Sequence, residues 1–581
     1  MKLSDFIMHF LYCHGVKHIF GYQGGSVTHL IDSLHKIKGL VYVQNYHEQA
    51  SALCADSYSR VTGHIGVAIA TSGPGATNLI TGIANAFFDS IPCIFITGQV
   101  STHSIKSMQE IRQQSFQETD IVSIVRPITK FAKTVLSPDT ILYDLEKALF
   151  HASSGRPGAV LLDIPHNIQA CEVEPERLDS FFESDEYVSE LHKQSQPDAS
   201  IIQQVSALLM NAKKPLVLAG GGLIPVRNRD IFNKFVHQFD IPVVCSLMGL
   251  GAISHEDPHY CGFIGSYGNR YANIALAKSD FLLVLGSRLD ERQTGSQKHL
   301  FARDAKIIHV DVDPHVLDQN VKADIGICCD LNYFLEGMIG TFQGNCNCHE
   351  KWINSIHALA EEFPSCPPVE SNYIDPNEFI HILSGKLASD AIVCSDVGQN
   401  MMWVAQSLEM SRNMRLLNSG GHGTMGYALP AGIGAYFASH KTQIICIMGD
   451  GGLQMNIQEL QTISRENIPV KIIVMNNHSL GMVRGFHEKY FDNKCYGTVA
   501  GYSNPDFAKV AYSYNIAYTR ISKKEDFDQI DSGLNSSFPH FFEIELSPHS
   551  QIIPEPDSSP RAVEDQFPLL DRETLNRILS S

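Results

Sequence analysis

The sequence predicts an α/β protein with three doubly wound domains, each built on a parallel sheet. Short apolar runs alternate with segments of helical periodicity, as at 67–71, 91–98, 214–220, 280–286 and 442–450. Such alternation is typical of βαβ units, in which parallel strands are buried on both faces. A length of 581 residues also exceeds what one hydrophobic core usually organises, which favours about three or four domains.

Two polar stretches divide the chain, and we predict that residues 175–198 and 343–372 are linkers. The division gives three domains and a tail, at 1–175, 196–342, 373–547 and 548–581. The group Cys346, Cys348 and His349 lacks a second cysteine pair at zinc spacing, which favours a loop over a metal site. The fourteen cysteines are otherwise dispersed, as expected in a reducing compartment.

The charge balance limits the partners. With 44 basic and 62 acidic residues the formal net charge is −18, which disfavours nucleic acid and anionic membranes. Any bound phosphate must therefore be held by backbone amides or by a metal ion. Because no apolar stretch approaches the ~20 residues of a membrane span, we expect a cytoplasmic protein.

A similar order of features occurs twice. In the first domain a strand ends at Gly73 and the next opens 19 residues later at Pro92, and in the third domain the same pattern joins residues 449 and 469 over 20 residues. Duplication of one unit would explain the match, and so would chance, because glycine turns after strands are common in α/β proteins. If the unit is duplicated, a site shared between the two copies is expected, since ligand pockets often lie at domain interfaces.

Two strand ends in the third domain carry the chemistry. One strand runs into the turn GDGG at 449–452, and the next ends in Asn476-Asn477. Because the carboxyl ends of parallel strands meet at one edge of a sheet, Asp450 and Asn477 are expected to converge. Carboxylate, amide and carbonyl oxygens suit Mg²⁺, and the glycines let backbone amides approach phosphate. The pattern predicts a diphosphate–metal clamp.

Six segments carry a family resemblance: SGPGATNLITGIANAFFDSIPCIFITGQV, FQETDIV, RPITK, GGHGTMGYALPAGIGA, GSRLDERQTG and GDGGLQMNIQELQTISRENIPVKIIVMNNHSLGMV. They resemble segments of the thiamine diphosphate enzymes, and in particular of the large subunit of acetolactate synthase. Matches in register extend over roughly residues 1–550, which is almost the whole chain.

The resemblance implies which first-domain residues act on the cofactor. Glu48 occupies the position of a glutamate that contacts the N1′ nitrogen of the aminopyrimidine ring and so promotes loss of the thiazolium C2 proton. That role favours a dry pocket and a raised pKa for the carboxyl. Gln117 is a second catalytic candidate, Gly25 a cofactor contact and Phe116 a substrate contact.

In the third domain the resemblance implies metal ligands and cofactor contacts. The ligands are Asp450, Asn477 and the carbonyl of Ser479. Met425 matches the apolar residue that wedges between the two cofactor rings, which makes it a catalytic and a binding candidate. The other implied contacts are Val397, Gly398, Gln399, Asn400, Gly423, Gly449, Gly451, Gly452, Leu480, Gly481 and Met482. Because the cofactor bridges two chains in this family, we expect a homodimer or homotetramer, with no regulatory subunit indicated.

The central domain has a weaker signal, the strand PLVLA running into a triple glycine at 220–222, which is not a G-x-G-x-x-G motif. Beside GSRLDERQTG it resembles the FAD domain of acetolactate synthases. The implied FAD contacts are Gly221, Gly222, Gly286, Arg288, Asp290 and Arg292. Arginine suits a diphosphate because its fork donates two hydrogen bonds. Related decarboxylases bind ADP or nothing there, and of these three alternatives we favour FAD in a structural role.

Four departures from the family pattern fall on the expected substrate side. Gln23 replaces a proline, His422 a leucine and Phe486 a tryptophan. The loop at 101–114 is longer than in anabolic acetolactate synthases and brings Arg112 just ahead of Phe116. These departures leave the cofactor chemistry intact and concern the acceptor.

The predicted function is that of a thiamine diphosphate- and Mg²⁺-dependent carboligase of acetolactate synthase type. It would decarboxylate pyruvate or another 2-keto acid and transfer the two-carbon unit to a second carbonyl compound. One alternative is a carboligase that acts on a keto sugar nucleotide in surface-polysaccharide synthesis. The segment 558–579 resembles the C-terminal ending of synthase-like proteins associated with such pathways. Another is a simple 2-keto acid decarboxylase or lyase, with His47 or His422 as the acid.

Overall fold

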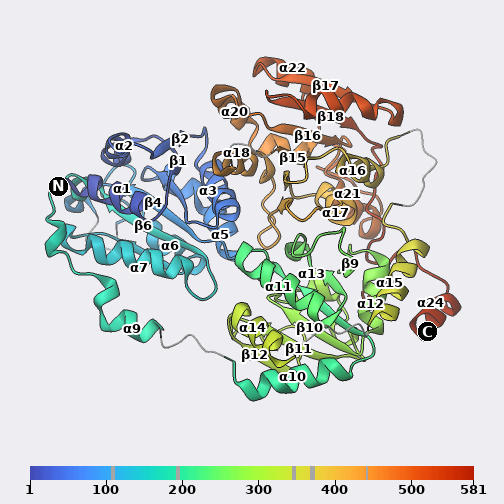
Figure 1. The fold of residues 1–581 in the computed structure, drawn as a ribbon. Helices are drawn as coiled ribbons and strands as arrows, with labels where there is room; N and C mark the ends of the chain where they lie inside the picture. The colour runs from blue at the N-terminus through green and yellow to red at the C-terminus, as the bar shows by residue number, and fades with distance from the viewer. Residues whose placement is uncertain (106–110, 192–196, 343–348, 367–372, 440–442, 581) are drawn as a thin grey trace.

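The computed structural model describes residues 1–581 except 106–110, 192–196, 343–348, 367–372, 440–442 and 581. Three six-stranded parallel sheets with helices packed on them make up the fold (Figure 1), which confirms the predicted fold class. None of the helices within the described residues is long and apolar enough to cross a membrane.

The first sheet has the strand order β2-β1-β3-β4-β6-β5. Its strands are β1 (His18–Tyr22), β2 (Val41–Gln44), β3 (Gly66–Ala70), β4 (Cys93–Gln99), β5 (Phe131–Thr134) and β6 (Ala159–Pro165). The helices in this part of the chain are α1 (Leu3–Cys13), α2 (Thr28–His35), α3 (Glu48–Thr62), α4 (Pro74–Asn78), α5 (Ile80–Phe88), α6 (Ile121–Val125), α7 (Ile141–Ser153), α8 (His166–Gln169) and α9 (Asp185–Leu191).

The central sheet has the order β12-β11-β10-β7-β8-β9. Its strands are β7 (Pro215–Ala219), β8 (Val243–Cys245), β9 (Tyr260–Phe263), β10 (Phe281–Leu285), β11 (Lys306–Asp311) and β12 (Ile325–Cys328). The helices are α10 (Ala199–Asn211), α11 (Val226–Phe239), α12 (Arg270–Lys278), α13 (Glu291–Thr294), α14 (Leu331–Thr341) and α15 (Glu350–Glu362).

The third sheet has the order β14-β13-β15-β16-β18-β17. Its strands are β13 (Ile392–Ser395), β14 (Arg415–Leu417), β15 (Ile444–Gly449), β16 (Lys471–Asn476), β17 (Ala517–Ile521) and β18 (His540–Glu545). The helices are α16 (Pro376–Ser384), α17 (Gln399–Ser407), α18 (Ala428–Ser439), α19 (Asp450–Met455), α20 (Leu460–Glu466), α21 (Gly481–Tyr490), α22 (Phe507–Ser513), α23 (Ile530–Leu534) and α24 (Arg572–Ser580).

The first and third sheets share one topology, and the central sheet has another. Counted within each domain, the first and third sheets both run 2-1-3-4-6-5, whereas the central sheet runs 3-2-1-4-5-6. The repeated glycine and proline signals fall at equivalent places, because Gly73 follows β3 and residue 449 ends β15. A common strand order is what duplication of one unit would produce, and it places two comparable ligand-binding edges in one chain.

The structure adds helices to three segments that the sequence left as linker or tail, namely α9 in 175–198, α15 in 343–372 and α24 in 548–581. In the 343–372 stretch, α15 buries Trp352, Ile353 and Ile356. These residues lie on one face of the helix, and the polar residues around them led to the prediction of a linker. The C-terminal segment folds back on the central domain, where Lys278 Nζ donates to the carbonyl of Ile578 at 2.6 Å. The tail therefore packs as part of the fold.

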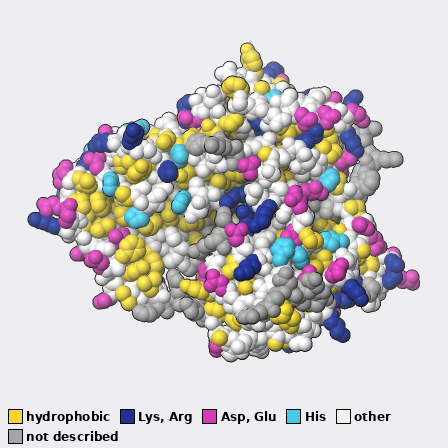
Figure 2. All heavy atoms as spheres, in the orientation of Figure 1, with side chains coloured by type: hydrophobic (Ala, Val, Ile, Leu, Met, Phe, Trp, Pro, Cys, Tyr) yellow, Lys and Arg dark blue, Asp and Glu magenta, His cyan; other side chains and the backbone are white. Residues whose placement is uncertain are grey.

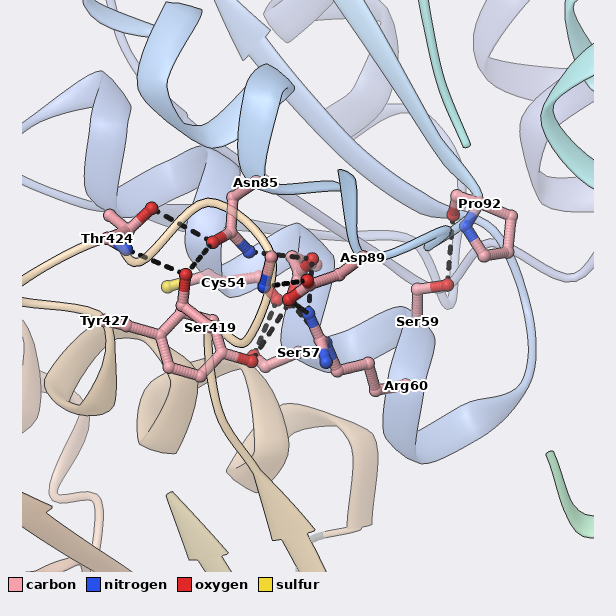
Figure 3. Close-up of polar contacts among 12 residues, drawn as sticks. Cys54, Ser57, Ser59, Arg60, Asn85, Asp89, Pro92, Ser419, Thr424 and Tyr427 are labelled. Carbon is pink, nitrogen blue, oxygen red and sulfur yellow. Dashed lines mark hydrogen bonds and ion pairs between the residues drawn. The ribbon is translucent and has the colours of Figure 1, made fainter. Parts of the chain in front are cut away.

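A buried ion network joins the first and third domains through α3 and α18 (Figure 3). Arg60 Nε lies 2.7 Å from Asp56 Oδ1, and Arg60 Nη2 lies 2.8 Å from Asp89 Oδ2. The hydroxyl of Tyr427, in the third domain, donates to Asp56 Oδ1 at 3.0 Å. Both carboxylates are almost fully buried, so the guanidinium compensates charges that water does not reach.

The same network holds the segment 419–424 of the third domain. Asn85 Oδ1 accepts from Ser419 Oγ at 2.5 Å and from Thr424 Oγ1 at 3.0 Å. The backbone N–H of Gly421 donates to Asp89 Oδ1 at 2.7 Å. As Figure 3 shows, first-domain side chains thus fix the backbone of a third-domain loop.

Replacing Arg60 by methionine is expected to lower the free energy of unfolding by about 3–5 kcal/mol, because two buried carboxylates lose their cation. Urea denaturation followed by circular dichroism measures the change. Lys36→Met is the matched control, since its ion pairs with Asp5 and Asp32 are exposed, and it should unfold as the unaltered protein does. Equal unfolding of both variants would mean that the network contributes nothing to stability.

Candidate active site

The predicted clamp lies at the switch point of the third sheet, where the chain leaves β13 in one direction and β15 in the other. Open α/β sheets bind ligands at this position, outside the carboxyl ends of their strands. Residues 396–400 follow β13, residues 449–452 end β15, and residues 476–479 end β16. Three neighbouring strand ends therefore present the predicted contacts at one edge.

The two predicted side-chain metal ligands are buried and held by amides. Asp450 is 2% exposed, and its Oδ2 accepts from Asn504 Nδ2 at 2.7 Å. Burial raises the pKa of Asp450, while the hydrogen bond from Asn504 lowers it. Asn477 Nδ2 donates to Gln399 Oε1 at 2.9 Å, and its Oδ1 accepts from the Ser479 N–H at 3.2 Å. A buried carboxylate among neutral oxygen donors fits a hard divalent cation such as Mg²⁺.

Two glycines of the clamp are packed too closely against neighbouring side chains for any larger residue. A Cβ at Gly451 would lie 2.6 Å from Leu480 Cδ2 and 3.0 Å from Met425 Cε. A Cβ at Gly481 would overlap the Gln399 side chain, at 1.9 Å from its Oε1. Met425 therefore lies beside the turn that would hold the diphosphate, and backbone amides can approach a ligand there.

Asp396 is a site residue that the sequence interpretation missed. Its carboxylate accepts from the N–H groups of Val397, Gly426 and Ala428 at 2.8–3.0 Å. It is fully buried, and burial raises its pKa to about 6. Asp396 thus fixes the turn that contains Met425. Its position directly after a strand, next to the predicted contacts at 397–400, was the available signal.

The other predicted third-domain contacts line the same edge. Gly398 begins the turn into α17, and Asn400 donates from Nδ2 to the Asp396 carbonyl at 2.7 Å. Gly423 has a φ of 72°, a left-handed conformation that favours glycine. Met482 packs against the apolar core. Their roles toward a cofactor remain predictions.

The first-domain candidates gather at the matching switch point, between β1 and β3. Glu48 begins α3 and is buried, and its Oε2 accepts from Asn78 Nδ2 at 2.9 Å. The sequence interpretation did not include Asn78. Gln117 packs on Gly73, where a Cβ would lie 2.9 Å from the Gln117 Cβ, and Gly25 opens the turn after β1.

The predicted substrate residues lie on the surface of the single chain. The side chains of Phe116 and Phe486 are 85% and 53% exposed. His422 stacks on Phe88 with ring centroids 5.6 Å apart. Among the described residues, no hydrogen bond or ring contact joins these three predicted residues, and part of the predicted 101–114 loop, 106–110, lies outside the described residues.

The central domain presents its glycines at a third switch point. Its strand order is that of dinucleotide-binding sheets, with the reversal between β7 and β10. A Cβ at Gly220 would lie 2.1 Å from the Gly286 carbonyl oxygen, and a Cβ at Gly222 would lie 3.1 Å from Gly286 Cα. His309 Nδ1, in the adjacent strand β11, is buried and has no hydrogen-bond partner among the residues that the structure describes. The bare backbone and the unpaired ring nitrogen fit a nucleotide ligand.

Two of the predicted FAD contacts already have partners. Arg288 Nε donates to Asp290 Oδ2 at 3.0 Å. Asp290 Oδ1 also accepts from the N–H groups of Arg292 and Gln293, which caps α13. Asp290 therefore has a structural role that accounts for its position, while Arg292 is exposed to solvent.

Family models match all three domains of the chain. The model described as "Thiamine pyrophosphate enzyme, N-terminal TPP binding domain" matches residues 1–124. The central-domain model of the same enzymes matches residues 202–338, and the C-terminal TPP binding domain model matches residues 396–544.

Acetolactate synthase large subunits are similar to this chain over most of their length. The large subunit from Cyanidium caldarium is 37% identical over 88% of this chain and 87% of its own. The Lactococcus lactis subsp. lactis (strain IL1403) large subunit is 34% identical over 93% of this chain and 92% of its own length. The isozyme 2 large subunit from Escherichia coli (strain K12) is 34% identical over 95% of this chain and 97% of its own length.

Asp450→Asn is expected to weaken Mg²⁺-dependent binding of thiamine diphosphate, because it removes the anionic ligand. Even the outer partners of metal ligands contribute about 10–100-fold in affinity, so the loss should be at least of that size. Titration of the cofactor at fixed Mg²⁺, by calorimetry, measures it. Asp506→Asn is the control, since Asp506 caps α22 at the surface. Equal affinities in both variants would exclude Asp450 as a ligand.

Proposed function

The chain belongs to the family of thiamine pyrophosphate enzymes and is a thiamine diphosphate-dependent enzyme related to acetolactate synthase, and on this premise we propose that it is a carboligase. It decarboxylates pyruvate or another 2-keto acid and transfers the two-carbon unit to a second carbonyl compound. The main support is the convergence of Asp450, Asn477 and Met425 at one sheet edge.

Bound thiamine diphosphate would supply an electron sink that lets pyruvate lose CO₂ and pass on its two remaining carbons. In the proposal, Asp450 and Asn477 hold the Mg²⁺ and, with the backbone at 451–452, fix the diphosphate. Met425, held through Asp396, keeps the two rings of the cofactor in one conformation. Glu48 would hold a proton at the aminopyrimidine nitrogen of the bound cofactor, while Asn78, whose Nδ2 donates to Glu48 Oε2, orients the carboxyl.

We further propose that each site takes Glu48 from one chain and the clamp from a second copy. In the single chain Glu48 bonds within its own domain, to Asn78, and Asp450 bonds to Asn504. The face of α3 that meets the third domain of the same chain is occupied by the Arg60 network. A homodimer is the smallest assembly that provides complete sites, and a homotetramer of two such dimers is equally consistent.

The central domain is proposed to bind FAD, with its diphosphate at the glycines of β7 and β10 and beside Arg288. The dinucleotide strand order and the unpaired His309 Nδ1 support this assignment. We expect purified protein to be yellow and to release free flavin on denaturation, seen by visible absorbance and fluorescence. Release of ADP, or of no nucleotide after growth with excess riboflavin, would contradict FAD.

The acceptor is tested with labelled pyruvate, thiamine diphosphate and Mg²⁺, supplied alone or with a keto sugar nucleotide. Acetolactate from pyruvate alone is the expected product. A labelled branched sugar formed in preference to acetolactate would assign the sugar as acceptor. Acetaldehyde as the sole product would overturn the carboligase proposal in favour of a decarboxylase.

Glu48→Gln is expected to lower kcat by about 10²–10⁴-fold, the usual contribution of a positioned acid–base group, while cofactor affinity changes little. Steady-state kinetics and cofactor titration measure the two quantities. Glu466→Gln, at the surface, is the matched control. Unchanged turnover in Glu48→Gln would remove the acid–base assignment.

Mixing Glu48→Gln with Asp450→Ala then tests the two-chain site. If sites are shared between chains, each mixed dimer has one intact site, and activity should return to about a quarter of the unaltered level after subunit exchange. A mixture that stays inactive after verified exchange would mean that each site is built within one chain.

A further inference from the structure

A histidine–carboxylate cluster lies on the central domain, away from its glycine turns. His237 is in the last turn of α11, Asp240 caps that helix, and Asp257 and His259 directly precede β9. These positions are at the amino ends of the strands, whereas the turns after β7 and β10 are at the carboxyl ends. Figure 2 shows histidine side chains gathered over the central domain.

The cluster has donor atoms at the spacing of metal ligands. Asp257 lies between two imidazoles, with Oδ2 2.9 Å from His237 Nε2 and Oδ1 2.8 Å from His259 Nδ1. The ligand atoms of the three side chains all lie within 4.8 Å of one another, and no other such group occurs within the described residues. The two rings are nearly perpendicular, at 83°, with centroids 4.9 Å apart, and one nitrogen of each ring contacts the Asp257 carboxylate.

The far side of His259 is held as in metal sites. Its Nε2 lies 3.1 Å from Asp240 Oδ1, and the N–H of His349 donates to Asp240 Oδ2 at 3.2 Å. Histidines that bind metal ions usually donate their other ring N–H to a carboxylate, which sets the tautomer and the ring orientation. Asp240 supplies this contact and leaves Nδ1 of His259 directed at Asp257.

The cluster is open on one side. The His259 and Asp257 side chains are largely buried, whereas that of His237 is 53% exposed. An ion can therefore reach the donor atoms from solvent, and water can complete its coordination. Two imidazoles and one carboxylate suit zinc and its transition-metal neighbours, and differ from the oxygen donors that favour Mg²⁺.

We propose that His237, Asp257 and His259 bind one divalent transition-metal ion of the zinc class, with Asp240 positioning His259. The ion replaces the protons that the ring nitrogens otherwise share with Asp257. It connects the end of α11 to the segment before β9, and so stabilises the central domain. The proposal is independent of the thiamine diphosphate site and of its Mg²⁺.

The test uses the full-length protein with saturating Mg²⁺, titrated with Co²⁺ and followed by visible absorbance, and with Zn²⁺ followed by calorimetry. We expect one equivalent of tight binding and a rise in melting temperature. His237→Ala and Asp257→Asn should bind at least about tenfold more weakly and lose the rise, and Asp240→Asn should bind about 10–100-fold more weakly.

His381→Ala is the matched control, because His381 is similarly exposed and has a single carboxylate partner, Glu409 at 3.3 Å. It should bind Co²⁺ as the unaltered protein does. His237 is exposed, so its alanine variant should fold, which circular dichroism and retained thiamine diphosphate binding verify. If the unaltered protein binds no Co²⁺, or if the His237 and Asp257 variants bind it equally well, the proposed site does not exist.

Discussion

The buried pairing of Arg60 with Asp56 and Asp89 organises the face of the first domain on which Tyr427 and the Gly421 backbone of the third domain bind. Loss of Arg60 would leave two carboxylates without a cation in a water-free contact, and the third domain bonds directly to both of these carboxylates. Helix α3 carries Asp56 and Arg60, and it also begins at Glu48. The helix that presents the candidate acid–base group therefore also holds Tyr427, two residues after Met425. In the proposed dimer, α3 would connect a residue of one site with the turn of the other.

All three sheets use the same physical feature for their candidate ligands. At a switch point two neighbouring loops leave in opposite directions, and glycines there let the backbone of both approach a phosphate. This arrangement allows an acidic chain to bind phosphate, because backbone amides and a bound cation supply the positive potential that its side chains lack. The ligand atoms of the two candidate metal sites also determine which ion each site prefers. Oxygens surround Asp450, while imidazoles surround Asp257, so the two candidate sites favour different metals.

Much of the fold and part of the candidate site could be predicted from the sequence. Apolar runs between helical patterns gave the parallel sheets, since both signals depend on neighbours along the chain. The GDGG turn and the asparagine pair identified one edge, because strand polarity alone brings Asp450 and Asn477 together. Helix α15 escaped prediction because only one face of it is apolar and its flanks are polar.

The sequence by itself determined the fold class, the family resemblance and the residues at the strand ends. Only the tertiary structure decided how these residues are held. Asn78 and Asp396 act on Glu48 and on the turn around Met425 through contacts 30 residues away, and the Arg60 network closes over more than 300 residues. His237 and Asp257 likewise meet only because the fold brings the end of α11 beside the segment that precedes β9. Local patterns record burial and turns, whereas the partner of a polar side chain depends on which distant segment the fold brings beside it.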